Sequence, residues 1–153
     1  MSALELSSLA ITQAVGERLG QALQPGDFIG LRGELGAGKT ALVRAIAAGA
    51  GVRSEEVASP TFALIHVYAG CSLTLYHADL YRLTTRDELY ATGYFDLLDD
   101  AGALLVEWVD RIASASPRDW LELRLFAVGP QARRIEGTAH GPRAEVLKRV
   151  VFG

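Results

Sequence analysis

The spacing of apolar residues along this chain changes several times between the period of a helix and that of a strand. In residues 10–23 the apolar side chains recur at near-helical spacing. In residues 119–127 they alternate instead, with leucine at every second position from 121 to 125. Residues 103–106 are apolar without interruption, which is typical of a strand buried on both faces. The pattern therefore predicts a mixed α and β fold.

Turn residues separate these segments and define the order of the elements. Pro25-Gly26 follows the first predicted helix, and Ala69-Gly70-Cys71 joins two β-prone segments into a hairpin. A capping box over residues 85–88 starts a helix that Gly93 would end. Besides that helix, we expect helices over residues 10–23, 39–49 and 142–152, and strands over 3–9, 27–32, 61–68, 72–77, 103–108, 119–127 and 132–138. The strand over 3–9 is expected at an edge of the sheet, and the strand over 132–138 is expected to pair with 119–127.

Composition indicates a folded protein of modest size. The chain has 153 residues, half of them apolar, and we expect one domain spanning residues 1–153. Cys71 is the single cysteine, so an internal disulfide is excluded. No apolar run reaches the roughly 18 residues that span a bilayer. We therefore expect a cytoplasmic protein without membrane contacts.

Charge is distributed unevenly around a net value of −3. Residues 79–110 hold eight acidic and two basic residues, whereas from Pro117 onward there are seven basic and four acidic residues. The overall sign argues against strong autonomous nucleic-acid binding. The basic C-terminal segment could contact a nucleotide, RNA or an acidic partner, or it could be an ordinary solvated surface.

A glycine-rich stretch between a predicted strand and a predicted helix carries the clearest chemistry. It reads Gly33-Glu34-Leu35-Gly36-Ala37-Gly38-Lys39-Thr40, and this context is the one that a phosphate-binding P-loop requires. Glycines let several backbone N–H groups point into one hollow, and the helix start adds free N–H groups and its dipole. Lys39 would reach the β- and γ-phosphates, and the Thr40 hydroxyl would ligate Mg²⁺.

The use of lysine at this place is itself informative. Of the 15 basic residues, 13 are arginine and only Lys39 and Lys148 are lysine. A compact point charge suits a phosphate inside a tight loop. The alternative is a glycine-rich turn that merely ends a strand. With the motif in its context, we expect an α/β fold of the P-loop NTPase type, in which a few helices flank a mixed sheet with a parallel core and an added antiparallel hairpin.

Two acidic residues follow predicted strands and are candidates for the metal site. Asp79 follows the strand over 72–77, and Glu107 closes the apolar run at 103–106. An acid at the carboxyl end of a central strand would face the nucleotide and could hold Mg²⁺ directly or through water. The alternative for each is a surface acid, which is less expected for Glu107 because an acid rarely closes a buried run.

Ser59-Pro60-Thr61 and His77 are weaker candidates. The hydroxyls of Ser59 and Thr61 could meet a γ-phosphate or its metal, although spacing alone favours a strand-entry turn. His77 lies two residues before Asp79 and so on the same strand face. We expect a buried, hydrogen-bonded histidine there rather than a catalyst.

Four segments together resemble the TsaE (YjeE) family of ATPases. Besides the P-loop at 33–40 they are Ser-Pro-Thr-Phe at 59–62, Tyr-His-Ala-Asp-Leu-Tyr-Arg-Leu at 76–83 and Glu-Trp at 107–108. They occur in the family's order and at its usual spacing, over most of the chain. Many proteins share the P-loop, whereas the other three segments in this combination are specific.

This resemblance implies an ATPase that binds and hydrolyses ATP with Mg²⁺. In that family the protein supports a TsaD–TsaB complex, which forms N6-threonylcarbamoyladenosine at position 37 of tRNAs that read codons beginning with A. It does not transfer the threonylcarbamoyl group itself. Hydrolysis resets or sustains the assembly, so tRNA would be a partner only through the complex.

The resemblance also implies roles for individual residues. Lys39 and Asp79 would support hydrolysis, and Thr61 would sense the γ-phosphate. Thr12 would lie near the adenine, and Arg133 or Arg134 corresponds to a family arginine near the base. The ATP phosphates would be bound by Glu34, Leu35, Gly36, Ala37, Gly38, Lys39 and Thr40, and Mg²⁺ by Thr40 and Glu107.

Two departures from the family pattern and two rival functions remain at this point. Val109-Asp110 follow Glu-Trp where the family usually has Pro or Ala and then Glu, and Ala41 replaces a usual second Thr.

One rival is a small-molecule kinase, for which Arg82 and Arg86 are the candidate lid arginines. The other is a nucleotide-gated binding module without useful hydrolysis.

Overall fold

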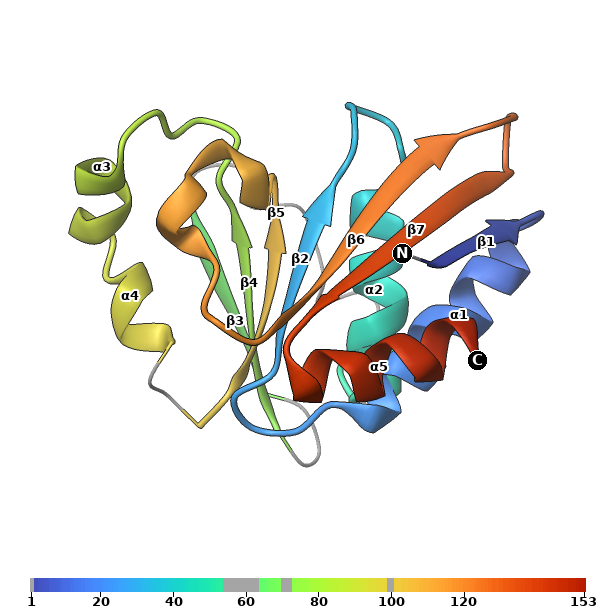
Figure 1. Cartoon of the computed structure of the whole chain (residues 1–153), viewed down its shortest axis with the longest axis horizontal. Helices are drawn as coiled ribbons and strands as arrows, with labels where there is room; N and C mark the ends of the chain where they lie inside the picture. Colours follow the sequence, from blue (N-terminus) through green and yellow to red (C-terminus); the bar gives the residue numbers. More distant parts are fainter. Residues whose placement is uncertain (1, 54–63, 70–72, 99–100) are drawn as a thin grey trace.

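The computed structural model describes residues 2–53, 64–69, 73–98 and 101–153 (Figure 1). No helix in this part of the chain is long and apolar enough to cross a membrane. The elements are β1 (Ser2–Leu6), α1 (Leu9–Ala22), β2 (Phe28–Arg32), α2 (Lys39–Gly49), β3 (Ile65–Ala69), β4 (Thr74–Asp79), α3 (Arg86–Ala91), α4 (Tyr94–Leu97), β5 (Ala103–Glu107), η2 (Val109–Arg111), η3 (Ala113–Ala115), β6 (Trp120–Ala127), β7 (Arg133–His140) and α5 (Pro142–Phe152).

The described strands form one seven-stranded sheet in the order β1-β7-β6-β2-β5-β4-β3. The four central strands β6, β2, β5 and β4 are parallel to one another. β3 adds to one side as the antiparallel partner of β4, and β7 and β1 add antiparallel strands on the other side. The predicted α/β fold with a parallel core and an antiparallel hairpin is therefore confirmed. The pairing of β7 with β6 and the edge position of β1 also agree with the strands predicted over 132–138 and 3–9.

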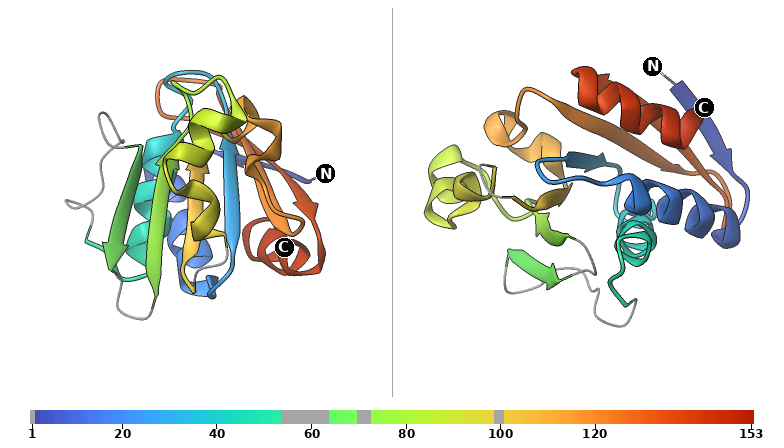
Figure 2. Two further views of the ribbon diagram at one scale, coloured as in Figure 1. Left: turned by 90° about the vertical axis from the view of Figure 1, so that its left-hand side faces the viewer. Right: turned by 90° about the horizontal axis from the view of Figure 1, so that it is seen from below.

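Alternate residues of the same strands enter two different cores. Ile29 and Leu105 belong to the larger core, to which α1, α2 and α5 contribute, whereas Phe28, Leu104 and Val106 belong to the smaller one beside α3, α4, η2 and η3. The central strands lie between α1 and α2 on one side and α3 and α4 on the other (Figure 2). β2 and β5 are thus buried on both faces, which explains the unbroken apolar run of β5, whereas β6 alternates between buried and more exposed residues.

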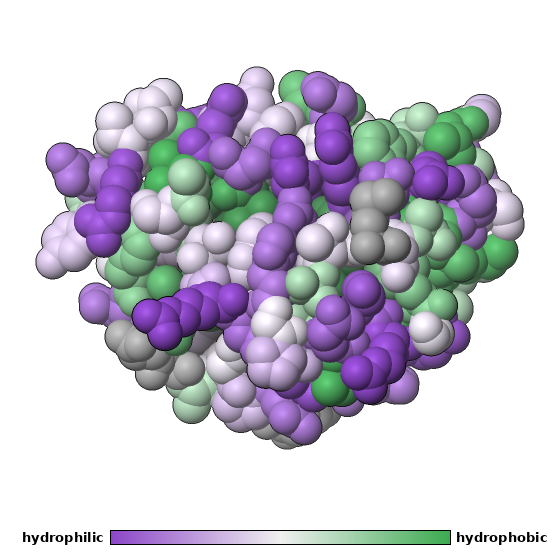
Figure 3. Space-filling model, viewed as in Figure 1, coloured by the Kyte–Doolittle hydropathy of each residue, from purple (hydrophilic) through white to green (hydrophobic). Residues whose placement is uncertain are grey.

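Element ends differ from the predicted ones where local hydrogen bonds decide them. β1 ends at Leu6 rather than at residue 9, because the Ser8 side chain accepts from Ile11 N at 3.2 Å and starts α1. The predicted capping box at Thr85–Glu88 is present. Gly93 ends α3 with φ 83° as predicted, but it also starts the short helix α4. Charged and polar side chains cover much of the face seen in Figure 3, with smaller hydrophobic areas between them.

Candidate functional site

The glycine-rich loop connects β2 to α2 at the carboxyl edge of the parallel strands (Figure 1). Its glycines take positive φ angles that other residues rarely adopt, 81° at Gly36 and 102° at Gly38. Gly38 is the N-cap of α2 and supplies no side chain to cap the helix, so the first backbone N–H groups of α2 stay available. A hollow of about 260 Å³ lies beside the loop and is lined by Leu35, Gly36, Gly38, Lys39, Thr40, Ala41, Asp79, Glu107 and Trp108.

Lys39 is the first residue of α2 and its side chain folds back over the loop. It is buried, with 5% of its surface exposed. Its Nζ donates hydrogen bonds to the carbonyl oxygens of Gly33 and Glu34, the second at 2.9 Å, and lies 4.3 Å from the centre of the Trp108 ring. Burial lowers the pKa of Lys39, while the negative charges of Glu107 and Asp79 act in the opposite direction. The loop therefore holds the desolvated ammonium group of Lys39, which could release the two carbonyl oxygens and bind an anion in their place.

The two candidate acids stand side by side at the ends of neighbouring parallel strands. Asp79 on β4 is the register partner of Glu107 on β5. Glu107 is buried with 3% exposed, and its Oε1 accepts a hydrogen bond from Thr40 Oγ1 at 3.3 Å. The fold thus brings Lys39, Thr40, Asp79 and Glu107 around one hollow, which is the arrangement that the spacing of the motifs predicts.

Asp79 is half-buried, and this placement affects its protonation. Burial raises the pKa of Asp79, whereas a hydrogen bond of 2.9 Å from Tyr81 N to Oδ1 lowers it and the neighbouring Glu107 raises it further. The net pKa shift is upward, which is the direction expected of a carboxyl group that handles a proton.

His77 is buried and hydrogen-bonded, as the sequence predicts. It is fully buried, and its Nε2 lies 2.6 Å from Glu107 Oε2. Its Nδ1 lies 3.5 Å from the hydroxyl of Tyr68, which is 3.2 Å from His66 Nδ1. The contact between His77 and Glu107 crosses from β4 to β5, so the sequence spacing could not indicate it.

Trp108, which lines the hollow, belongs to a cluster with Tyr81 and Arg111. The rings of Tyr81 and Trp108 are 4.9 Å apart, and the guanidinium of Arg111 lies 4.9 Å from the centre of the Tyr81 ring. Arg111 Nε also donates to the carbonyl of Tyr81 at 2.9 Å. Trp108 takes the left-handed conformation with φ 57°, which turns the chain directly after Glu107. No motif signalled Arg111, whereas Tyr81 lies within the segment at 76–83.

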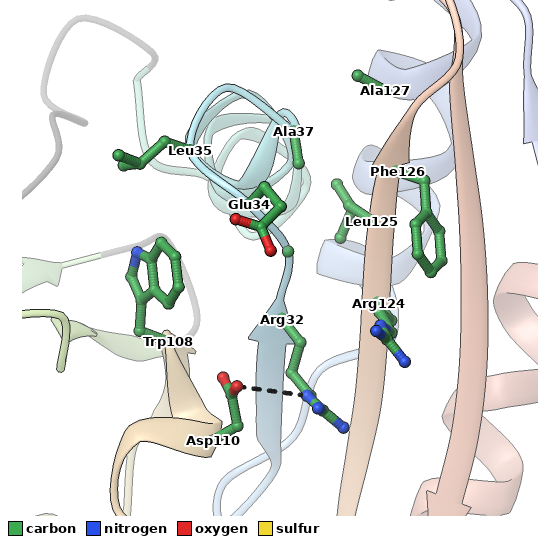
Figure 4. A pocket seen from close by; sticks show the side chains of 11 residues that line it. Arg32, Glu34, Leu35, Ala37, Trp108, Asp110, Arg124, Leu125, Phe126 and Ala127 are labelled. Carbon is green, nitrogen blue, oxygen red and sulfur yellow. Dashed lines mark ion pairs between the residues drawn. The ribbon is translucent and has the colours of Figure 1, made fainter.

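A second hollow of about 320 Å³ lies between the loop, Trp108 and the end of β6. Figure 4 shows Trp108 on one side and Arg124 and Phe126 on the other, with Arg32 and Asp110 below the loop. Arg32 donates to Glu122 at 2.8 Å and its Nε is 3.7 Å from Asp110. The Glu122 hydrogen bond raises the pKa of Arg32, so this side chain stays charged.

The remaining predicted residues lie in different places. Arg133 lies against the loop, since a Cβ placed on Gly38 would come within 3.1 Å of its Nε. Arg134 pairs with Glu5 and Glu136, each at 3.1 Å, on the side of the sheet edge formed by β1. The Thr12 hydroxyl, buried in α1, donates to the carbonyl of Ser8 at 3.3 Å. Thr61 and the rest of Ser59-Pro60-Thr61-Phe62 lie outside the described residues.

The donor set around the hollow fits Mg²⁺ rather than a metal with nitrogen or sulfur ligands. Thr40 contributes a hydroxyl, and Glu107 and Asp79 contribute carboxylates, which are the hard oxygen donors that Mg²⁺ takes. Among the described residues no group of three or more His, Cys, Asp or Glu could hold a metal by itself.

Comparison with known proteins gives one consistent result. The model of the family described as threonylcarbamoyl adenosine biosynthesis protein TsaE matches residues 6–135. A TsaE protein of Bacillus subtilis strain 168 is 37% identical over 136 residues, covering 89% of this chain and 84% of the relative. A TsaE protein of Treponema pallidum is 38% identical over 120 residues, covering 78% and 87%. Both relatives are named for tRNA threonylcarbamoyladenosine biosynthesis.

A solved structure agrees with these sequence matches. The crystal structure of Bacillus subtilis YdiB superposes with a TM-score of 0.78 and 29% sequence identity, and the match covers 97% of this chain and 92% of that chain. The similarity therefore includes the antiparallel strands and α5 as well as the P-loop core.

Proposed function

This chain belongs to the TsaE family of threonylcarbamoyl adenosine biosynthesis proteins, and on that premise we propose that it is an ATPase that binds and hydrolyses ATP with Mg²⁺. The observation that carries the proposal is the convergence of a buried lysine, a hydroxyl and two carboxylates on one hollow at the start of α2. In this proposal residues 1–153 act as one P-loop ATPase domain.

In this proposal the loop and the start of α2 bind the phosphates. The backbone N–H groups of residues 34–40 and the positive end of the helix dipole attract the phosphates. Lys39 exchanges the carbonyls of Gly33 and Glu34 for phosphate oxygens, so its charge neutralises the one that develops during hydrolysis. Preorganised charge of this kind needs little rearrangement when the reaction occurs.

Metal binding and water activation involve Thr40, Glu107 and Asp79, which line the same hollow as Lys39. Thr40 and Glu107 hold Mg²⁺, which supplies charge neutralisation on the phosphates when bound. Asp79, whose pKa is raised by burial, orients the attacking water and accepts its proton. Thr61 contacts the γ-phosphate, and Thr12 and Arg133 contact the nucleoside; Arg133 already lies against the loop at Gly38.

A partner completes the active machinery. We propose that the chain works with a TsaD–TsaB complex in the cytoplasm and that it reaches tRNA only through that complex. Turnover by the chain alone is slow, because effective P-loop hydrolysis usually needs an additional charge supplied to the transferring phosphate.

The decisive experiment measures phosphate release and tRNA modification over many cycles, with and without TsaD–TsaB. We expect stimulation of phosphate release by the partners. Asp79→Asn should still bind ATP but hydrolyse it about 100-fold or more slowly, as is typical for loss of a general base. Lys39→Ala should lose ATP binding, and Asp87→Asn on the exposed surface of α3 should behave as the wild type.

Each rival function predicts a different result in the same assay. Transfer of the γ-phosphate to a metabolite instead of water would identify a kinase. Full tRNA modification by Asp79→Asn, with loss of modification in Lys39→Ala, would identify a binding module that needs no hydrolysis.

A further inference from the structure

A chain of hydrogen bonds leads from the candidate metal ligand Glu107 back into the sheet. Glu107 Oε1 accepts from Thr40 Oγ1 at 3.3 Å, on the side of the hollow. Its other oxygen, Oε2, lies 2.6 Å from Nε2 of the fully buried His77. His77 Nδ1 then lies 3.5 Å from the Tyr68 hydroxyl. The two carboxylate oxygens of Glu107 thus have different partners on different sides.

The hydrogen-bond pattern assigns the proton on His77. An ionised carboxylate only accepts hydrogen bonds, so Nε2 of His77 must carry a hydrogen, and this N–H donates the hydrogen bond to Glu107. Nδ1 then accepts from the Tyr68 hydroxyl, although at 3.5 Å this second hydrogen bond is weak. The short contact to Glu107 therefore fixes the imidazole more firmly than the contact to Tyr68 does.

Lys39 does not take over this role. Its ammonium is bound to the carbonyl oxygens of Gly33 and Glu34. A buried carboxylate needs hydrogen-bond donors, and the contact of His77 with Glu107, at 2.6 Å, is shorter than that of Thr40, at 3.3 Å. Removing that donor would leave Oε2 free to rotate toward the hollow.

We propose that His77 is a positioning residue, which holds Glu107 so that a single oxygen, Oε1, faces the cation and thereby favours Mg²⁺ over Ca²⁺. This inference rests on the proposed Mg²⁺-dependent nucleotide binding. Mg²⁺ takes near-octahedral, one-oxygen contacts to carboxylates, whereas the larger Ca²⁺ readily takes both oxygens of one carboxylate. A carboxylate tied back through Oε2 serves the first geometry and resists the second.

The test compares variants that differ in the donor at position 77. His77→Leu removes the donor while keeping an apolar side chain of moderate size, and His77→Gln keeps an N–H donor. His66→Leu is the matched control, because His66 contacts Tyr68 but is one step further from Glu107. Affinity for a fluorescent ADP analogue is measured without metal and in titrations with Mg²⁺ and Ca²⁺.

In His77→Leu we expect a rise of about tenfold or more in the Mg²⁺ concentration that gives half of the maximal change in affinity for the ADP analogue. Losses of this size are typical when a residue that hydrogen-bonds to a metal ligand is removed. The preference for Mg²⁺ over Ca²⁺ should fall in the same variant. His77→Gln should recover much of both effects, and His66→Leu should match the wild type. Metal-free nucleotide affinity should stay unchanged in all variants, which a general structural defect would not allow.

The outcomes separate this inference from the proposed function. Wild-type binding that responds to Mg²⁺, with the same Mg²⁺ requirement in a folded His77→Leu, overturns the inference alone. Wild-type binding that ignores Mg²⁺ overturns the proposed function and the inference with it.

A measurement on the wild type keeps the inference testable should His77→Leu not fold. The imidazole N–H proton resonance of His77, assigned by its absence in His77→Gln, should shift when Mg²⁺ is added to the ADP complex. Its position should not change on adding Mg²⁺ without nucleotide. An unchanged resonance in the Mg²⁺–ADP complex contradicts a link between His77 and the metal.

Discussion

At the scale of single residues, the buried charges of the candidate site bond to neutral polar groups rather than to each other. Lys39 and Glu107 both lie below 10% exposure, yet the lysine is bound to loop carbonyls and the carboxylate to a histidine and a threonine. Each charge therefore has polar partners already, and a ligand can replace the carbonyls at Lys39 or the Thr40 hydroxyl at Glu107 without leaving the charge bare. Direct pairing of the two side chains would instead have to be broken before phosphate or metal could bind.

Asp79→Asn is expected to stabilise the protein without ligands at neutral pH while it impairs hydrolysis. Burial raises the pKa of Asp79, so the folded state keeps this proton to higher pH than the unfolded chain, whose value is about 3.8. Stability from this group is therefore present at low pH and is lost as pH rises through the folded-state pKa. Asn carries no charge and can still accept from Tyr81 N. Thermal unfolding should show a higher Tm at pH 7, and a difference that vanishes below about pH 4.

The control for this prediction is Asp87→Asn, which removes an exposed acid from α3. It should bring no gain in Tm at pH 7. A lower Tm for Asp79→Asn at pH 7 would show that the carboxylate is stabilising where it stands, contrary to the effect of burial.

At the scale of elements, the position of α2 depends on how closely α1 packs against it. Glycines make this approach possible: a Cβ on Gly16 would overlap Ala45, one on Gly20 would overlap the carbonyl of Ile46, and one on Gly49 would overlap the carbonyl of Glu17. Two of these three conflicts involve backbone atoms, which cannot move aside as a flexible side chain can. The glycines of α1 thus help to set where the start of α2, and with it Lys39, lies.

Gly20→Ala is expected to lower the free energy of unfolding by about 2 kcal/mol, although alanine is the better helix former by about 1 kcal/mol. The added methyl group must push α1 away from α2. Gly129→Ala is the matched control, because its Cβ would meet only Ala132 at an ordinary 3.5 Å. Urea unfolding measures both variants. Equal stability of Gly20→Ala and the wild type would mean that the helices separate at little cost.

At the scale of the whole molecule, residues at the carboxyl edge of the parallel strands form the candidate site, whereas residues at the amino edge contribute to stability. The carboxyl edge carries the loop, Asp79 and Glu107. At the amino edge, the buried Asp27 before β2 accepts two hydrogen bonds of 2.9 Å from Arg143 of α5, which also donates to the carbonyl of Ala22 at 2.7 Å. This network joins α1, β2 and α5 far from the hollow, so stability and ligand binding are separable.

Arg143→Met is expected to destabilise the protein by about 2 kcal/mol and to leave nucleotide affinity unchanged. The variant leaves Asp27 buried with fewer partners, and the partial exposure of Arg143 keeps the loss below that of a fully buried pair. Lys148→Met on the same helix removes only a 3.5 Å surface contact to Glu145 and should cost under about 0.5 kcal/mol. Urea unfolding and nucleotide titration measure the two properties, and a weakened affinity in Arg143→Met would contradict the separation of the two edges.

The sequence by itself determined the features that depend on local order. The P-loop, the capping box at Thr85–Glu88, the buried run ending at Glu107 and the placement of Asp79 after its strand all follow from neighbouring residues and their period. Glycines, caps and apolar periodicity act within a few residues, so these features could be predicted without knowledge of the fold.

Only the tertiary structure decided which distant groups meet. The contact of His77 with Glu107, the cluster of Tyr81, Trp108 and Arg111, and the approach of Arg133 to Gly38 each join elements that are separate in the sequence. The same holds for the pairing of β1 with β7, since the pattern predicted β7 as the partner of β6 but did not say which strand β1 would join. Periodicity states which face of a strand is buried, but strand order and register determine what lies opposite that face, and these depend on packing of the whole chain.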